Sequence, residues 1–181
     1  MRTIRLAGLL LSFIVLFSGC EKFKEKRFST TIPYEFEVEI TESGSTTVNL
    51  TGEMTSMINE ELEKVKDKIK RYELVSVTYK IWEFYGAEPN TFTGSIGFGN
   101  ANSTAPGLNY AYTGIDLRAN NDAPDQVKMN LNSQDIALIQ QYFMDTNGLK
   151  LYFTGDVEQK PCHFVMQIIC NIDAIAEVEK K

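Results

Sequence analysis

The strict alternation of apolar and polar residues between positions 34 and 41 limits this chain more than any other feature of its sequence. The apolar set is Tyr34, Phe36, Val38 and Ile40, and the polar set is Glu35, Glu37, Glu39 and Thr41. Because successive side chains of a β-strand point to opposite faces, this pattern predicts a strand with one buried face and one acidic, solvated face. A similar alternation predicts a long final strand from Cys162 to about Ala176.

Two other segments repeat apolar residues every three or four positions, which predicts amphipathic helices. The first helix is marked by Ile58, Leu62, Val65, Ile69 and Tyr72. The second is marked by Ile136, Ile139 and Phe143, with Asn132 or Ser133 as its cap and Asn147-Gly148 as its end.

Further apolar alternation predicts strands near residues 46–51, 74–84, 92–98, 108–117, 127–131 and 149–153. The whole pattern predicts an α+β fold made mainly of antiparallel β-sheet, which can curl into a sandwich, with two amphipathic helices. The length of the chain fits one such domain, which we expect to span residues 32–181.

The first twenty residues have the composition of a targeting signal. Arg2 and Arg5 precede an apolar run of about a dozen residues, which is shorter than the roughly 20 needed to span a bilayer. The string Phe17-Ser18-Gly19-Cys20 resembles a bacterial lipobox. This resemblance implies that residues 1–19 are a lipoprotein signal peptide and that Cys20 is acylated. The charged stretch that follows predicts a lipidated tether over residues 20–31.

Taken whole, the chain resembles small envelope lipoproteins of unknown function found in Bacteroidetes. The lipobox carries the resemblance, together with Leu74-Val-Ser-Val-Thr-Tyr-Lys-Ile after a charged helix and the tail strand from Pro161 to Ala174. The resemblance implies a lipid-anchored protein of the cell envelope. Glu21, rather than Asp, beside Cys20 favours the outer membrane. The resemblance supplies no activity and no functional residues.

Composition excludes several classes of function. The formal charge of −6 without a basic block argues against a nucleic-acid partner, which requires clustered Lys and Arg. Cys162 and Cys170 lie eight residues apart on one predicted strand, about 26 Å, so we expect buried thiols rather than a disulfide. His163 is the only histidine, and no catalytic, metal or cofactor motif is recognisable. We therefore expect a non-enzymatic protein without a cofactor.

Aromatic residues are the candidate binding residues. Trp82 and Phe84 share the more polar face of their predicted strand. Tyr85 follows them, and Tyr110 and Tyr112 lie in the irregular middle of the chain. These five residues could form a platform that stacks on a sugar ring or anchors a protein. The alternative is that residues 99–125 fold over the rings and bury them.

Two sets of oxygen ligands leave further alternatives open. Glu35, Glu37 and Glu39 could hold Ca²⁺ or act in acid–base chemistry, and the loop 120–125 offers Asn and Asp side chains. A solvated strand face and a simple turn explain the same residues. The leading hypothesis is thus a lipid-anchored module that binds a protein or glycan. The alternatives are a carrier of lipid or another hydrophobic ligand and, third, a carboxylate-dependent hydrolase.

Overall fold

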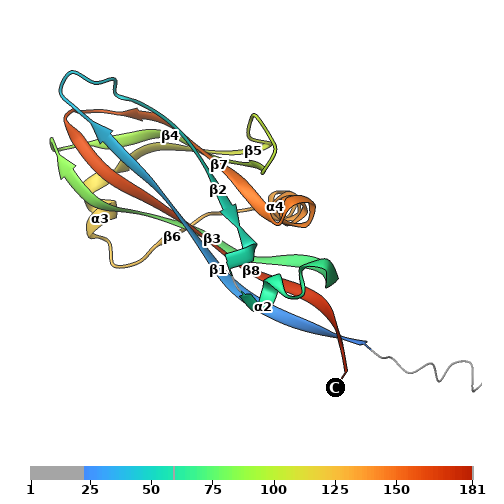
Figure 1. Ribbon diagram of the computed structural model, residues 1–181. Coiled ribbons are helices and arrows are strands. Elements are labelled where there is room, and N and C mark those ends of the chain that lie inside the picture. Colours follow the sequence, from blue (N-terminus) through green and yellow to red (C-terminus); the bar gives the residue numbers. More distant parts are fainter. Residues whose placement is uncertain (1–22, 59, 181) are drawn as a thin grey trace, which may run out of the picture.

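A computed structural model describes residues 23–58 and 60–180, which form two four-stranded antiparallel sheets that face each other (Figure 1). Sheet A has the strand order β1 (Phe23–Ile40), β8 (Cys162–Glu179), β3 (Ile69–Gly86) and β6 (Val127–Lys128). Sheet B has the order β2 (Thr47–Thr55), β7 (Gly148–Val157), β4 (Thr91–Asn100) and β5 (Leu108–Asp116). The mainly antiparallel β architecture predicted from alternation is confirmed.

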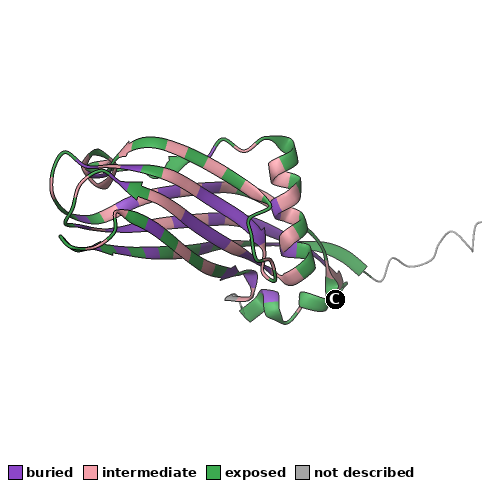
Figure 2. Ribbon diagram, turned by 90° about the horizontal axis from the view of Figure 1, so that it is seen from above, coloured by how far each residue is buried: buried purple, intermediate pink, exposed green. Residues whose placement is uncertain are grey.

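Side chains from both sheets fill the space between them. Phe153 on β7 lies at the centre, and the centroid of its ring is 4.7 Å from that of Phe92, 5.5 Å from Phe36 and 6.3 Å from Phe164. The alternation at 34–41 contributes as expected, since Phe36, Val38 and Ile40 are buried while the glutamates between them are exposed. Buried and exposed positions alternate along the strands (Figure 2). The core therefore spans both sheets.

The second predicted helix is confirmed as α4 (Ser133–Thr146). The Asn132 side chain accepts hydrogen bonds from the backbone N–H groups of Gln134 and Asp135, and the Asp135 carboxylate accepts one from Asn132 in return. This reciprocal pair satisfies donors that the first turn of a helix leaves unpaired. Asn147 ends the helix with a left-handed backbone, φ 55°.

The first predicted helix is wrong. The described residues of this segment, 56–58 and 60–68, form only the short helical turns η1 (Ser56–Ile58), α2 (Glu60–Glu63) and η2 (Lys66–Lys68), and β3 then begins at Ile69. Pairing of β3 with β8 and a buried hydrogen-bond network favour the strand over the helix that the periodicity predicts. In this network the Tyr72 hydroxyl lies 2.9 Å from Ser56 Oγ and donates to Asn147 Oδ1. Helix periodicity is a weak preference that tertiary pairing can override.

The predicted tether is wrong for residues 23–31, because β1 already begins at Phe23 and pairs with β8 along its whole length. The first five residues of this strand are exposed on both faces, so the sequence has no apolar alternation there that would predict a strand. Cys20 and the predicted signal peptide, residues 1–19, lie outside the described residues. Within the described ranges, no helix combines the length and apolar composition needed to cross a bilayer.

The remaining strands follow the predictions in part. The weak strand predicted near 108–117 is confirmed as β5, and the predicted alternation at 127–131 shrinks to the two residues of β6. Between these strands lies the short helix α3 (Leu117–Asp122), which packs beside β3.

Candidate functional site

An irregularity in β3 decides which aromatic side chains reach the surface. Trp82 pairs with Val165 on β8, but the next pair is Tyr85 with His163, so Glu83 and Phe84 together oppose one residue. This is a β-bulge, and Glu83 adopts a left-handed backbone with φ 52°. The extra residue reverses the alternation that the sequence suggests.

The prediction that Trp82 and Phe84 share a face is therefore wrong. Phe84 points into the core and is 2% exposed, while Tyr85 returns to the same face as Trp82 and is 66% exposed. Directly paired residues of an antiparallel sheet lie on the same side. Val165 and His163, the partners of Trp82 and Tyr85, alternate with the core residue Phe164, so this shared side is the outer face of sheet A.

The same outer face carries the glutamates of β1. In the β1–β8 pairing, Glu37 opposes Val165 and Glu39 opposes His163, so β8 stands between the aromatic residues and the carboxylates. Two strand spacings separate the Cα atoms of Trp82 and Glu37, about 10 Å. We call this surface the aromatic–acidic face, and it consists of Trp82, Tyr85, His163, Glu35, Glu37 and Glu39.

Tyr85 and His163 form a stacked pair on the face, in which Tyr85 is exposed and His163 is partly exposed. Their rings stack with centroids 6.1 Å apart and an angle of 27° between the ring planes. A groove of about 380 Å³ adjoins them and is also lined by Glu39, Glu42 and Pro161. Aromatic rings beside a groove can stack against a planar or ring-shaped group of a ligand.

Trp82 is half-buried, and its indole Nε1 has no hydrogen-bond partner among the described residues. Since that nitrogen is itself buried, whatever part of the indole reaches solvent is apolar ring surface. Trp82 therefore offers stacking area rather than a hydrogen-bond donor.

The aromatic–acidic face carries unbalanced negative charge. None of the ion pairs found among the described residues includes Glu35, Glu37 or Glu39. Glu35 accepts a hydrogen bond from Gln167 at 2.8 Å. The ammonium group of Lys80 donates to the backbone oxygen of Ala123. The carboxylates are thus available to hydrogen-bond donors or cations of a ligand.

The loop considered for calcium serves a different purpose. Asn120 Oδ1 accepts a hydrogen bond from the backbone N–H of Ile81 at 2.6 Å, and Asn121 Oδ1 accepts one from Phe84 at 3.0 Å. The two amides therefore cap the open edge of β3 at the bulge. In the part of the chain that the structure describes, no group of three or more His, Cys, Asp or Glu side chains could hold a metal ion.

Sequence reasoning missed the capping role of these two amides. The Asn-Asn pair was visible in the sequence, but its partners lie about 40 residues away, so no local signal identified them.

Tyr110 and Tyr112 do not join the aromatic–acidic face. Both lie on β5 in sheet B, where the ring of Tyr112 contacts that of Tyr79 with centroids 5.1 Å apart. The Tyr110 hydroxyl donates to the Asp135 carboxylate, and burial with that carboxylate raises the pKa of Tyr110. Burial also raises the pKa of Tyr112. These tyrosines pack the side of the molecule between β5, β3 and α4.

The two cysteines on β8 are free and buried, as expected. Burial raises the pKa of the Cys170 thiol to about 12, so the reactive thiolate form is scarce at neutral pH. His163 lies on the opposite face of the strand from Cys162. Neither of these two described cysteines therefore forms a nucleophilic pair with His163.

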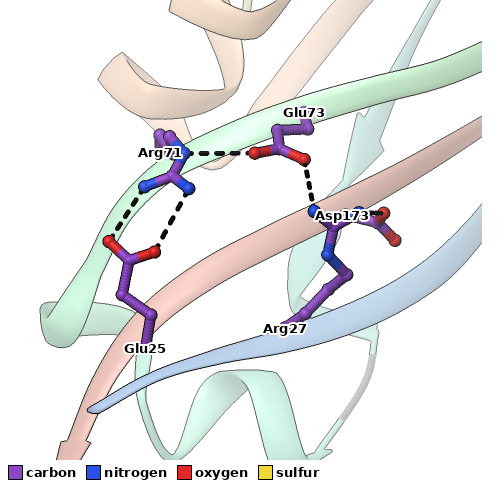
Figure 3. A network of polar contacts seen from close by, with 5 residues as sticks. All are labelled: Glu25, Arg27, Arg71, Glu73 and Asp173. Carbon is purple, nitrogen blue, oxygen red and sulfur yellow. Dashed lines mark hydrogen bonds and ion pairs between the residues drawn. The ribbon is translucent and has the colours of Figure 1, made fainter.

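A network of ion pairs lies on sheet A near the beginning of β3 (Figure 3), whereas Tyr85 lies near the end of that strand. Arg71 on β3 binds the Glu25 carboxylate of β1 through two hydrogen bonds and also contacts Glu73. Arg27 joins Glu73 to Asp173 on β8, with distances of 2.8 and 2.7 Å. The network ties the beginning of β1 to β3 and β8.

Comparison with known proteins identifies no family. No protein-family model and no curated protein matches the chain. Among solved structures, a chain of turnip yellow mosaic virus has a TM-score of 0.36 and 11% identity, covering 86% of this chain and 98% of that chain. A chain of Desmodium yellow mottle tymovirus has a TM-score of 0.31 and 18% identity, covering 85% of each chain. TM-scores this far below 0.5 support no statement about the fold or function of this protein.

Proposed function

We propose that this protein is a lipid-anchored component of a bacterial cell envelope, attached to the outer membrane through Cys20, that binds a protein or glycan through the aromatic–acidic face. The observation that carries the binding proposal is the meeting of Trp82 and Tyr85 with Glu37 and Glu39 on one exposed sheet face. The sequence motif at Phe17-Ser18-Gly19-Cys20 supports the anchoring.

The chemistry of the face suits a ligand that has both a flat apolar surface and polar donors. Ring surfaces of Trp82 and Tyr85 can stack on a sugar or on an aromatic or cationic side chain. Carboxylates on the neighbouring strand can accept hydrogen bonds from hydroxyl groups or pair with cations. Contacts of both kinds together would set the orientation of the ligand.

The geometry favours this proposal over the other two functions. A carrier of a hydrophobic ligand needs an internal cavity, whereas the space between the sheets is occupied by rings in mutual contact around Phe153. A hydrolase needs carboxylates in a protected cleft, whereas Glu35, Glu37 and Glu39 are exposed.

Cross-linking of the lipidated protein in its own envelope tests the binding surface. We expect the W82A/Y85A variant to reduce the yield of a specific cross-linked partner at least tenfold. If the partner is a glycan, we expect the amount of protein retained on the purified envelope glycan to fall at least tenfold instead. V75A is the matched control, because Val75 is 58% exposed on the same strand and outside the face.

Circular dichroism and thermal unfolding show whether the double variant stays folded. Equal capture by the wild type, W82A/Y85A and V75A would contradict the proposed binding surface. Loss of capture in V75A as well would show that the effect is not specific to the two aromatic residues.

A further inference from the structure

The end of the domain at which β1 begins has a composition different from that of the rest. It comprises residues 23–28, 60–73 and 173–180, and we call it the basal end (Figure 1). It carries nine basic and nine acidic side chains. The remaining described residues carry five basic against fourteen acidic side chains, a formal charge of −9. The basal end is therefore the neutral part of an otherwise acidic domain.

The basal end also exposes apolar surface. Phe23, the first residue of β1, is 45% exposed beside a groove lined by Lys24, Lys70 and Lys180 together with Glu25 and Glu177, and Lys70 pairs with Glu177 at 2.8 Å. A second groove of about 490 Å³ lies over the buried ring of Phe28 and beside Val65 and Val178, and both lysines and the carboxylates of Glu61 and Glu179 border it. The Lys26 ammonium sits 4.4 Å above the centre of the Phe28 ring. Apolar side chains bordered by lysines, whose long stems keep the ammonium group at the surface, are found on surfaces that bind the bilayer interface. Here glutamates neutralise part of that lysine charge.

The length of the chain places this end beside the membrane if Cys20 is acylated. Only three residue steps separate Cys20 from Phe23, and a fully extended chain spans about 3.6 Å per residue. The Cα atom of Phe23 then lies within about 11 Å of that of Cys20. Polar headgroups occupy a layer of about 5 to 7 Å on each side of a bilayer, so even a fully extended link keeps Phe23 inside this layer or within a few ångströms of it.

We propose that the basal end is a membrane-docking surface, in which Phe23 enters the headgroup layer and the lysines around it face lipid phosphates. This inference rests on the proposed acylation of Cys20. The aromatic–acidic face then points away from the membrane, because Glu37 lies fourteen residues along β1 from Phe23, about 46 Å. The acidic remainder of the domain is kept away from an anionic lipid surface by the same orientation.

The single tryptophan of the chain allows a direct test. The full-length lipidated protein is reconstituted in vesicles of phosphatidylethanolamine and phosphatidylglycerol (3:1), with and without lipids brominated in the acyl chains. Wild-type protein reports on Trp82, and the F23W/W82F variant reports on position 23. Mass spectrometry of the same samples measures acylation of Cys20.

We expect brominated lipids to remove at least half of the fluorescence at position 23 and to leave Trp82 emission unchanged. Acylated protein without quenching at position 23 would overturn the docking surface while leaving the anchor intact. Quenching of Trp82 would mean the opposite orientation and would overturn it as well. A protein without acylation at Cys20 would refute the anchor and, with it, the docking argument.

Discussion

At the scale of single residues, Glu83 determines the chemistry of the exposed face. Its left-handed backbone is part of the β-bulge, and because of this bulge Phe84 points into the core and Tyr85 points to the outer face. A non-glycine residue in this conformation costs about 1–2 kcal/mol, which here is offset by the hydrogen bonds that Asn120 and Asn121 accept from the backbone N–H groups of Ile81 and Phe84. Strain of this kind is often found where a strand re-aims a side chain.

Substitutions at position 83 test this strain. We expect Glu83→Gly to change the free energy of unfolding by less than about 0.5 kcal/mol, because relief of the left-handed strain offsets the greater flexibility of glycine when unfolded. Glu83→Val should destabilise by about 1–2 kcal/mol, because a β-branched residue resists positive φ. Urea unfolding measures both. Equal stability of the two variants would show that the bulge is not strained.

At the scale of elements, β3 shows why alternation alone misassigns side chains. The bulge between Trp82 and Tyr85 has a counterpart earlier in the strand, where the register shifts between Leu74 and Ser76. Val75, which simple alternation places inside, is 58% exposed as a result. The beginning of β1 is attached to sheet A in another way, because ion pairs rather than apolar packing hold its charged side chains to β3 and β8.

The pH dependence of stability tests the attachment of β1. The hydrogen bonds from Arg71, with its charge, hold the pKa of Glu25 below its usual value near 4.5. Just below pH 4.5 the Glu25 carboxyl is therefore protonated more often in the unfolded chain than in the folded protein. The stabilisation that the Arg71–Glu25 pair gives to the folded state is thus complete above that pH and is lost as the pH falls further. We expect the Glu25→Gln variant to lose less of its thermal stability between pH 4.5 and 3 than the wild type does.

The matched control for that experiment is Glu37→Gln, which removes an exposed carboxylate that forms none of the described ion pairs. It should keep the wild-type pH slope. Because Glu25 is at the surface, added salt should reduce the difference between the wild type and Glu25→Gln. Identical slopes for all three proteins at low salt would rule out a stabilising role for the Arg71–Glu25 pair.

At the scale of the whole molecule, one aromatic cluster joins the two sheets. Phe153 of sheet B contacts Phe36 and Phe164 of sheet A, as well as Phe92 beside it. The ion pairs and the aromatic–acidic face both lie on the outer side of sheet A. Both therefore depend on this cluster, because it packs sheet A against sheet B.

Truncation of the central ring should therefore affect the entire fold. We expect Phe153→Ala to lower the free energy of unfolding by about 3–5 kcal/mol, through lost burial and the cavity left behind. Val75→Ala, at an exposed position, should change it by less than about 0.5 kcal/mol. Chemical unfolding followed by circular dichroism measures both. A cost below about 1.5 kcal/mol for Phe153→Ala would mean that the two sheets are stable without this contact.

The sequence by itself determined the features that depend on neighbouring residues. Alternation at 34–41 identified the buried and acidic faces of β1, and the spacing and caps between Asn132 and Asn147 identified α4. Cys162 and Cys170 were recognised as buried thiols because eight residues on one strand cannot bring two sulfur atoms together. Each of these conclusions needs only the local geometry of a strand or helix.

Only the tertiary structure decided which distant segments meet. Glu37 and Trp82 are 45 positions apart and never pair with each other, yet each pairs with Val165, so β8 brings them onto one face. The helical pattern at 58–72 gave way to a strand for the same reason, because the partner of Tyr72 is Ala174. Strand pairing is a non-local interaction, and the bulge that sets its register depends on amides from α3.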